Sequence, residues 1–202
     1  MTMSVNTISL GLFIVSATAL LGSPGPGIAS LLAVGRTAGL VKGLTYYLGM
    51  QAGLAIAAGF CAVGLFSLLD LIPDALDVMA AMAAAYLLYL AYRIASAPVG
   101  VAITDGRFTS SFSAGLLLGL ANPKAFIAFV SLFASQTIMT GDQRADATVK
   151  WLLVIVIMVV VDFIWLSVGT VLRRVSMRPG TERALNLTLG ALIVAATLLA
   201  FL

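Results

Sequence analysis

Two proline motifs interrupt long apolar stretches at corresponding places in the two halves of the chain. The first lies at residues 23–27 and the second at residues 122–124, and one offset pairs Pro26 with Pro123. Proline lacks a backbone N–H and clashes with the carbonyl four residues earlier, so each motif breaks a helix that runs into it. Paired breaks in the two halves of an apolar chain are the best sequence indication of a binding site in a secondary transporter.

The composition is that of an integral membrane protein. Hydrophobic residues make up 61% of the 202 residues and charged residues 9%, and the mean hydropathy is +1.13. Soluble domains carry about 25% charged residues. A chain of this length forms one transmembrane domain without a separate soluble domain, and we expect no binding to nucleic acid. The chain has no His, and Cys61 is its only Cys. We therefore expect no zinc site or other metal site, no cofactor and no enzymatic activity.

Six segments are long and apolar enough to cross a bilayer as helices, which takes about 20 residues each. They are expected near residues 6–38, 43–69, 75–95, 109–139, 149–172 and 184–202. A straight helix over the first segment would be roughly 50 Å long, against a hydrocarbon core of about 30 Å. The first and fourth segments are both too long for one straight crossing, and both contain a proline motif. The breaks must absorb the excess length.

Basic residues concentrate in alternate connections between these segments. The connections after the first, third and fifth segments hold eight of them: Arg36, Lys42, Arg93, Arg107, Arg173, Arg174, Arg178 and Arg183. The other side holds Arg144 and Lys150. The positive-inside rule places the eight in the cytoplasm and both termini outside. Three helices per half then insert in opposite orientations. We predict an all-α membrane protein of two inverted repeats, about residues 1–97 and 98–202, with its first and fourth helices broken at the proline motifs.

The breaks bring polar groups into the bilayer interior. The half-helix that begins near Gly27 would aim N–H groups at the first break, and Ser23 is a candidate N-cap. Asn122 can cap the half-helix that begins at Pro123, and Lys124 adds a positive charge beside this second helix N-terminus. A carboxylate suits such a place. The alternative interpretation is that both motifs are structural kinks, with Lys124 reaching along its helix toward an interface.

The fifth segment contains Asp162 near its middle. A carboxylate at the bilayer centre costs a few kcal/mol, so it is a functional candidate, as a proton carrier or as the partner of a cation. A structural ion pair with Lys124 is the alternative. Gln51 either contacts the substrate or only bonds across helices. Tyr46 and Tyr47 are expected to belong to an aromatic belt at the membrane interface.

The motifs, taken together and in order, resemble those of the LysE/RhtB amino-acid exporters. They are Ser-Pro-Gly-Pro-Gly at 23–27, Tyr-Leu-Leu-Tyr-Leu at 86–90, Gly-Leu-Ala-Asn-Pro-Lys-Ala at 119–125 and Val-Asp-Phe-Ile-Trp at 161–165. The resemblance implies a bacterial inner-membrane exporter of amino acids or close derivatives, driven by the proton motive force. Many members carry an Asp and a His where this chain has Leu54 and Ala57. These departures indicate a less polar substrate or a coupling scheme that relies more on Asp162 and Lys124.

The leading hypothesis is a proton-coupled exporter of a small zwitterion, with alternating access between its two halves. The candidate substrate- and ion-binding residues are Ser23, Pro24, Gly25, Pro26, Gln51, Asn122, Pro123, Lys124 and Asp162. The expected partners are an amino acid, protons and membrane lipids, and a homodimer is left open. The alternatives are a transporter of another small solute or ion on the same fold, and a membrane assembly subunit that does not transport.

Overall fold

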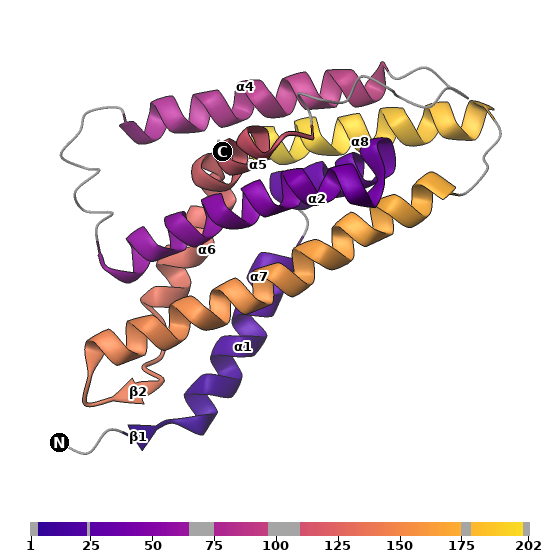
Figure 1. The fold of residues 1–202 in the computed structure, drawn as a ribbon. Coiled ribbons are helices and arrows are strands. Elements are labelled where there is room, and N and C mark those ends of the chain that lie inside the picture. The colour runs from indigo at the N-terminus through magenta and orange to yellow at the C-terminus, as the bar shows by residue number, and fades with distance from the viewer. Residues whose placement is uncertain (1–3, 24, 65–74, 97–109, 175–178, 200–202) are drawn as a thin grey trace.

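The computed structural model describes residues 4–23, 25–64, 75–96, 110–174 and 179–199. This part of the chain is mostly helical, in agreement with the predicted all-α class (Figure 1). The helices are α1 (Thr7–Gly22), α2 (Pro26–Ala62), α4 (Ala75–Ala95), α5 (Phe112–Ala121), α6 (Pro123–Phe133), α7 (Gln143–Arg174) and α8 (Pro179–Leu199). Two short strands, β1 (Ser4–Val5) and β2 (Met139–Thr140), pair antiparallel.

The described helices support some of the six predicted membrane spans. Among the described residues, α2 and α7 are long and apolar enough to span a membrane, and the bent pair of α5 and α6 makes a third candidate span. α1 is apolar but shorter, and α4 covers the third predicted segment, residues 75–95. The presence of six spans therefore stays a prediction.

The connection predicted at residues 39–42 coincides with a break inside α2, because the backbone of Gly39 is not helical. Tyr46 bonds with Ser30, 16 residues earlier, so the stretch after Gly39 folds back along the stretch before it. The helix kinks at Gly39, where φ is 76° and ψ is 178°. Glycine adopts this positive φ without the steric cost that a Cβ would bring. Arg36, predicted in that connection, is a residue of α2 instead. Its guanidinium donates to Oδ1 of Asn186 and lies 3.8 Å from the carboxylate of Glu182, both on α8.

α2 packs against α5 with the two backbones in direct contact. Gly49 and Gly53 of α2 face Gly115 and Gly119 of α5, and each pair has the small-xxx-small spacing that lets membrane helices approach closely. A Cβ added to Gly49 would overlap the carbonyl oxygen of Phe112. This contact places the end of α5, where the second proline motif lies, beside the middle of α2.

A second glycine contact joins α2 to α7. A Cβ on Gly35 would overlap the carbonyl oxygen of Leu166, and one on Gly169 would overlap that of Leu32. α2 therefore has close neighbours on two sides. Figure 1 shows α2 between α7 and the pair formed by α4 and α8, with α1 crossing near α7.

Tyr46 and Tyr47 do not form part of an interfacial belt. Tyr46 is 0% exposed and Tyr47 is 5% exposed. Tyr46 donates its hydroxyl to Oγ of Ser30 at 2.9 Å, and Tyr47 donates to the carbonyl of Val159 at 2.8 Å. The prediction failed because the chain folds back at Gly39, which packs Tyr46 against Ser30 of the preceding stretch, while Tyr47 packs against α7.

A buried ion pair organises the start of α7. Nζ of Lys150 lies 2.9 Å from Oδ2 of Asp146, and Oδ1 of Asp146 accepts hydrogen bonds from the backbone N–H groups of Ile138 and Met139 at 2.6 and 2.8 Å. Lys150 also donates to the carbonyl of Phe133, the last residue of α6, at 3.2 Å. Lys150 was predicted in a connecting segment, but it is a buried residue of α7. The pair ties α7 to the end of α6.

The glycine contact between α2 and α5 predicts a specific loss of stability. Gly49→Ala should lower the unfolding free energy by about 1–3 kcal/mol, because the new methyl group forces the two backbones apart. Gly11→Ala is the matched control, since nothing lies within 4 Å of a Cβ at this exposed position of α1. Thermal unfolding of both purified variants in detergent tests this expectation. Equal stability of the two variants would contradict the contact.

The ion pair of α7 predicts an asymmetry between single and double variants. Asp146→Asn should destabilise the protein by about 3 kcal/mol, because it leaves the ammonium of Lys150 buried without its counter-charge. Adding Lys150→Met should recover part of this loss in the same unfolding measurement. A double variant as unstable as the single one would show that the unpaired charge is not the cause.

Candidate functional site

Both proline motifs lie where one helix ends and another begins. α1 ends at Gly22 and α2 begins at Pro26, whereas α5 ends at Ala121 and α6 begins at Pro123. The axes of α5 and α6 differ by 52°. Proline suits the first position of a helix, where its missing N–H would have no helical partner. Each motif therefore starts a new helix as well as ending the one before it.

The caps of the two new helices differ. Asn122 caps α6, because its Oδ1 accepts from the backbone N–H of Ala125 at 3.4 Å. Ser23 was predicted to cap α2, but the cap residue is Gly25, and no side chain caps this helix. The hydroxyl of Ser23 instead donates to the carbonyl of Leu20 at 2.9 Å. The first helical residue is Pro26, so Ser23 lies too early in the chain to serve as the cap.

The two breaks lie against each other. The ammonium of Lys124 donates a hydrogen bond to the backbone carbonyl of Ser23. A Cβ on Gly25 would lie 2.5 Å from Cδ of Lys124, and one on Gly27 would lie 3.1 Å from Nδ2 of Asn122. Segments about a hundred residues apart in the sequence thus form one polar junction. In it, the second motif supplies the ammonium that binds a backbone carbonyl of the first.

A small cavity opens at this junction. Its volume is about 40 Å³, which is enough for a few water molecules. The first turns of both α2 and α6 line it, so two helix N-termini and their partial positive charges face one space. Its lining residues are Leu20, Leu21, Gly25, Gly27, Ile28, Met50, Leu54, Asn122, Lys124, Ala125, Ala128, Met158 and Asp162.

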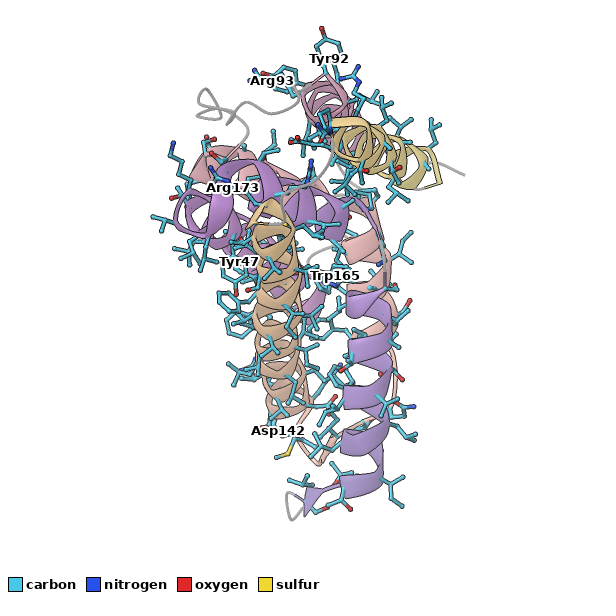
Figure 2. The ribbon with its side chains drawn as sticks, turned by 90° about the vertical axis from the view of Figure 1, so that its right-hand side faces the viewer. Tyr47, Tyr92, Arg93, Asp142, Trp165 and Arg173 are labelled. Carbon is cyan, nitrogen blue, oxygen red and sulfur yellow. The ribbon has the colours of Figure 1, made fainter. Side chains whose placement is uncertain are left out.

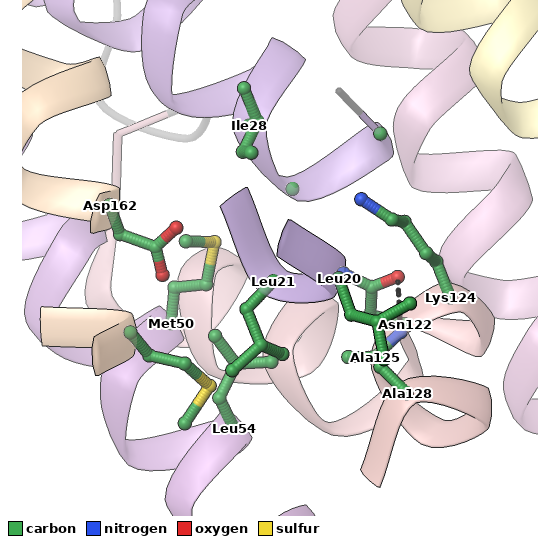
Figure 3. A pocket seen from close by; sticks show the side chains of 13 residues that line it. Leu20, Leu21, Ile28, Met50, Leu54, Asn122, Lys124, Ala125, Ala128 and Asp162 are labelled. Atoms are coloured by element: carbon green, nitrogen blue, oxygen red, sulfur yellow. Dashed lines mark hydrogen bonds between the residues drawn. The ribbon is translucent and has the colours of Figure 1, made fainter. Parts of the chain in front are cut away.

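Asp162 supplies the negative charge of the cavity. It lies on α7 and is 6% exposed. Figure 3 shows its carboxylate on one side of the cavity, with Lys124 and Asn122 on the opposite side. Oδ2 of Asp162 accepts a hydrogen bond from Nε2 of Gln51 at 2.7 Å. The carbonyl oxygen of that amide, Oε1, is buried without a hydrogen-bond partner among the described residues.

The structure brings most of the predicted residues to one place. Gly25, Asn122, Lys124 and Asp162 line the cavity, and Gln51 reaches it through its bond to Asp162. The other four have different positions or lie outside the description. Ser23 contributes its carbonyl, while its side chain belongs to a separate open groove between α1 and α7. Pro26 and Pro123 begin helices without lining the cavity, and Pro24 lies outside the described residues.

Sequence reasoning missed the apolar wall of the cavity, which includes Met50, Leu54 and Met158. Helical spacing offered a signal for part of it. Residues four apart lie on the same face of a helix, so Met158 shares the face of Asp162 on α7, and Leu54 shares the face of Met50 on α2. No signal in the sequence indicated which faces of the two helices meet.

The charges around the cavity complement a small molecule that carries one charge of each sign. A carboxylate on the side of Lys124 would meet an ammonium group and two helix N-termini. A cationic group on the other side would meet the carboxylate of Asp162. Among the described lining residues these are the charged side chains, one of each sign. The cavity is therefore electrostatically matched to a zwitterion.

One comparison with known proteins identifies a relationship. The family model described as LysE type translocator matches residues 18–201, which is most of the chain and includes every residue of the cavity lining. No curated protein and no solved structure matches the chain.

The bond between Gln51 and Asp162 predicts energetic coupling between the two residues. Gln51→Leu should lower the unfolding free energy by about 2 kcal/mol, because a buried charged acceptor loses its donor. In an Asp162→Leu background the same change should cost little. Unfolding of the two single variants and the double variant in detergent measures the coupling. Additive losses would show that the two side chains do not interact.

Proposed function

Because the chain belongs to the LysE type translocator family, it is a membrane transporter, and we propose that it exports amino acids or close derivatives across the bacterial inner membrane. We propose further that it is a secondary active exporter that exchanges its substrate for protons by alternating access. The observation that carries this proposal is the cavity in which Lys124 and two helix N-termini oppose Asp162. These groups complement the carboxylate and the ammonium of an amino acid.

The architecture proposed for this transporter is two inverted repeats of three spans, with both termini outside. The bent pair of α5 and α6 supplies a broken element in the second half, and the α1–α2 junction supplies its counterpart in the first. Both breaks contribute to one cavity, as expected for a site between repeats. Figure 2 shows Arg93 and Arg173 toward one end of the molecule and Asp142 at the other. The basic end would face the cytoplasm.

The polar contacts at the breaks support a binding role. In lipid, irregular backbone is tolerated where it is buried in protein or lines water. Here the carbonyl of Ser23 already accepts a hydrogen bond from the ammonium of Lys124, and Asn122 already caps α6. The hydrogen-bond donors at the start of α2, which has no side-chain cap, include the backbone N–H groups of Gly27 and Ile28. A substrate carboxylate would accept from these groups.

Asp162 would couple export to proton entry because it can bind only one positive partner at a time. In the inward-facing state its carboxylate binds the ammonium of the substrate. After the site opens outward, a proton binds the carboxylate and the amino acid leaves. With Asp162 neutralised by the proton, the empty site then returns inward, where the proton dissociates. Each cycle moves one amino acid out and one proton in.

Access requires movement of the helices that line the cavity. With a volume of about 40 Å³, the cavity is far smaller than the several hundred Å³ of typical ligand sites. In the proposed cycle, this conformation therefore represents a contracted state of the site without bound substrate. Rocking one repeat against the other would separate the α2 and α6 termini and enlarge the site.

Efflux from loaded membrane vesicles under an imposed pH gradient tests the proposed function. We expect amino-acid efflux from vesicles with the protein, and a decrease of about thirtyfold or more in Asp162→Asn, because loss of one partner of a buried charge pair costs about 2 kcal/mol or more. Asp142→Asn is the control. Asp142 caps the start of α7 with hydrogen bonds to Arg144 and Ala145, and Asn preserves such a cap.

The variant and the parent protein test different parts of the proposal, namely the role of Asp162 and the transport function itself. Efflux equal to that of the parent would remove Asp162 from the mechanism. Absence of proton-driven efflux of any amino acid by the parent protein would overturn the proposed function itself.

A further inference from the structure

The charges in the cavity allow only a narrow class of amino acid. Lys124 and Asp162 are the charged side chains among the described lining residues. In the proposed function, the first takes the substrate carboxylate and the second takes the ammonium. Neither of these two side chains is then left to pair with a charge on the side chain of the substrate. A lysine-like or glutamate-like side chain would therefore carry an unpaired charge into a buried space, which is strongly unfavourable.

The remaining wall of the cavity is apolar. Eight lining residues have aliphatic or thioether side chains: Leu20, Leu21, Ile28, Met50, Leu54, Ala125, Ala128 and Met158. Figure 3 shows Leu20, Leu21 and Leu54 between the side of Asp162 and the side of Lys124. A substrate that spans the two charges would rest its own side chain on this surface. A polar side chain that rested on these eight residues would lose water without gaining hydrogen bonds from their side chains.

The methionines make this wall adaptable. Met50 and Met158 come from α2 and α7 and are 1% and 2% exposed. Unbranched thioether side chains repack around ligands of different shape more readily than branched ones. The wall can therefore accept several aliphatic side chains, while the two fixed charges set the position of the backbone of the substrate.

We propose that the transported substrates are zwitterionic amino acids with an apolar, aliphatic or thioether side chain, and that Leu54, Met50 and Met158 form the subsite for that side chain. This inference rests on the proposed function and narrows its substrate class. Discrimination against charged side chains arises from a missing counter-charge, and discrimination against polar ones from missing hydrogen-bond partners.

Binding and counterflow measurements with a defined set of probes test the inference. L-Leucine, L-methionine and L-norvaline are compared with L-lysine, L-glutamate and L-serine, by thermal shift of the purified protein and by counterflow in proteoliposomes. We expect the apolar group to bind and exchange at least about tenfold better than the others. Two leucine analogues, 3-methylbutan-1-amine and 4-methylpentanoate, each lack one charge and should bind at least about tenfold more weakly than leucine.

A variant of the wall provides a second test. Leu54→Asn should reduce the preference for leucine over serine by about tenfold, because it places an amide on the apolar subsite. The control is Leu48→Asn, the same exchange at an outward-facing position of α2 that is 56% exposed. The control should leave the ranking of substrates unchanged. The comparison of probes with the parent protein stands even when the Leu54 variant fails to fold.

The outcomes distinguish the inference from the proposed function. Preference for lysine, glutamate or serine, in a protein that does transport amino acids, would overturn the apolar substrate class and leave the function standing. Equal binding of leucine and of both singly charged analogues would overturn the assignment of the two charges. Failure to bind or transport any of the probes would overturn the function and the inference together.

Discussion

The close approach of α2 to both α5 and α7 is the contact on which the rest of the structure depends. In a membrane, apolar side chains gain little from leaving lipid for protein, so helices associate largely through tight packing. Glycines at the two crossings, such as Gly49 against α5 and Gly35 against α7, remove the Cβ atoms that would separate the backbones. α5 ends at the second break, and α7 carries Asp162. The same contacts that hold the bundle together therefore place the charged residues around the start of α2.

The breaks are costly features that support each other. Each proline motif ends one helix and starts another, which leaves backbone groups without helical partners. The carbonyl of Ser23 is satisfied by Lys124 from the other half of the chain, and the first turn of α6 is capped by Asn122. The start of α2 has no side-chain cap. Because only one of the two helix starts has a side-chain cap, hydrogen-bond donors lie on one side of the cavity and a carboxylate on the other. This polarity complements that of an amino acid.

The sequence predicted correctly those features that follow from the chemistry of a single residue. Proline disrupts a helix that runs into it, so the sequence located both places where one helix ends and another begins. A carboxylate in an apolar segment must find a polar partner, so the sequence marks Asp162 as a site candidate, and the structure shows Gln51 as its partner. The resemblance to the LysE/RhtB exporters rested on these same motifs, and the family match confirms it. The boundaries of α4 followed from hydropathy alone, since a run of apolar residues ends where polar ones begin.

The sequence by itself thus determined the membrane class, the places where helices break and the presence of one buried acid, because these follow from backbone chemistry and from the cost of burying charge. Only the tertiary structure decided that α2 folds back on itself at Gly39, that Tyr46 is buried, and that Met50 and Met158 share a wall with Leu54. These features depend on how each helix is rotated and kinked against its neighbours. That rotation results from many contacts between segments far apart in the chain, and a local pattern such as the glycine spacing of α2 does not say which helix it meets.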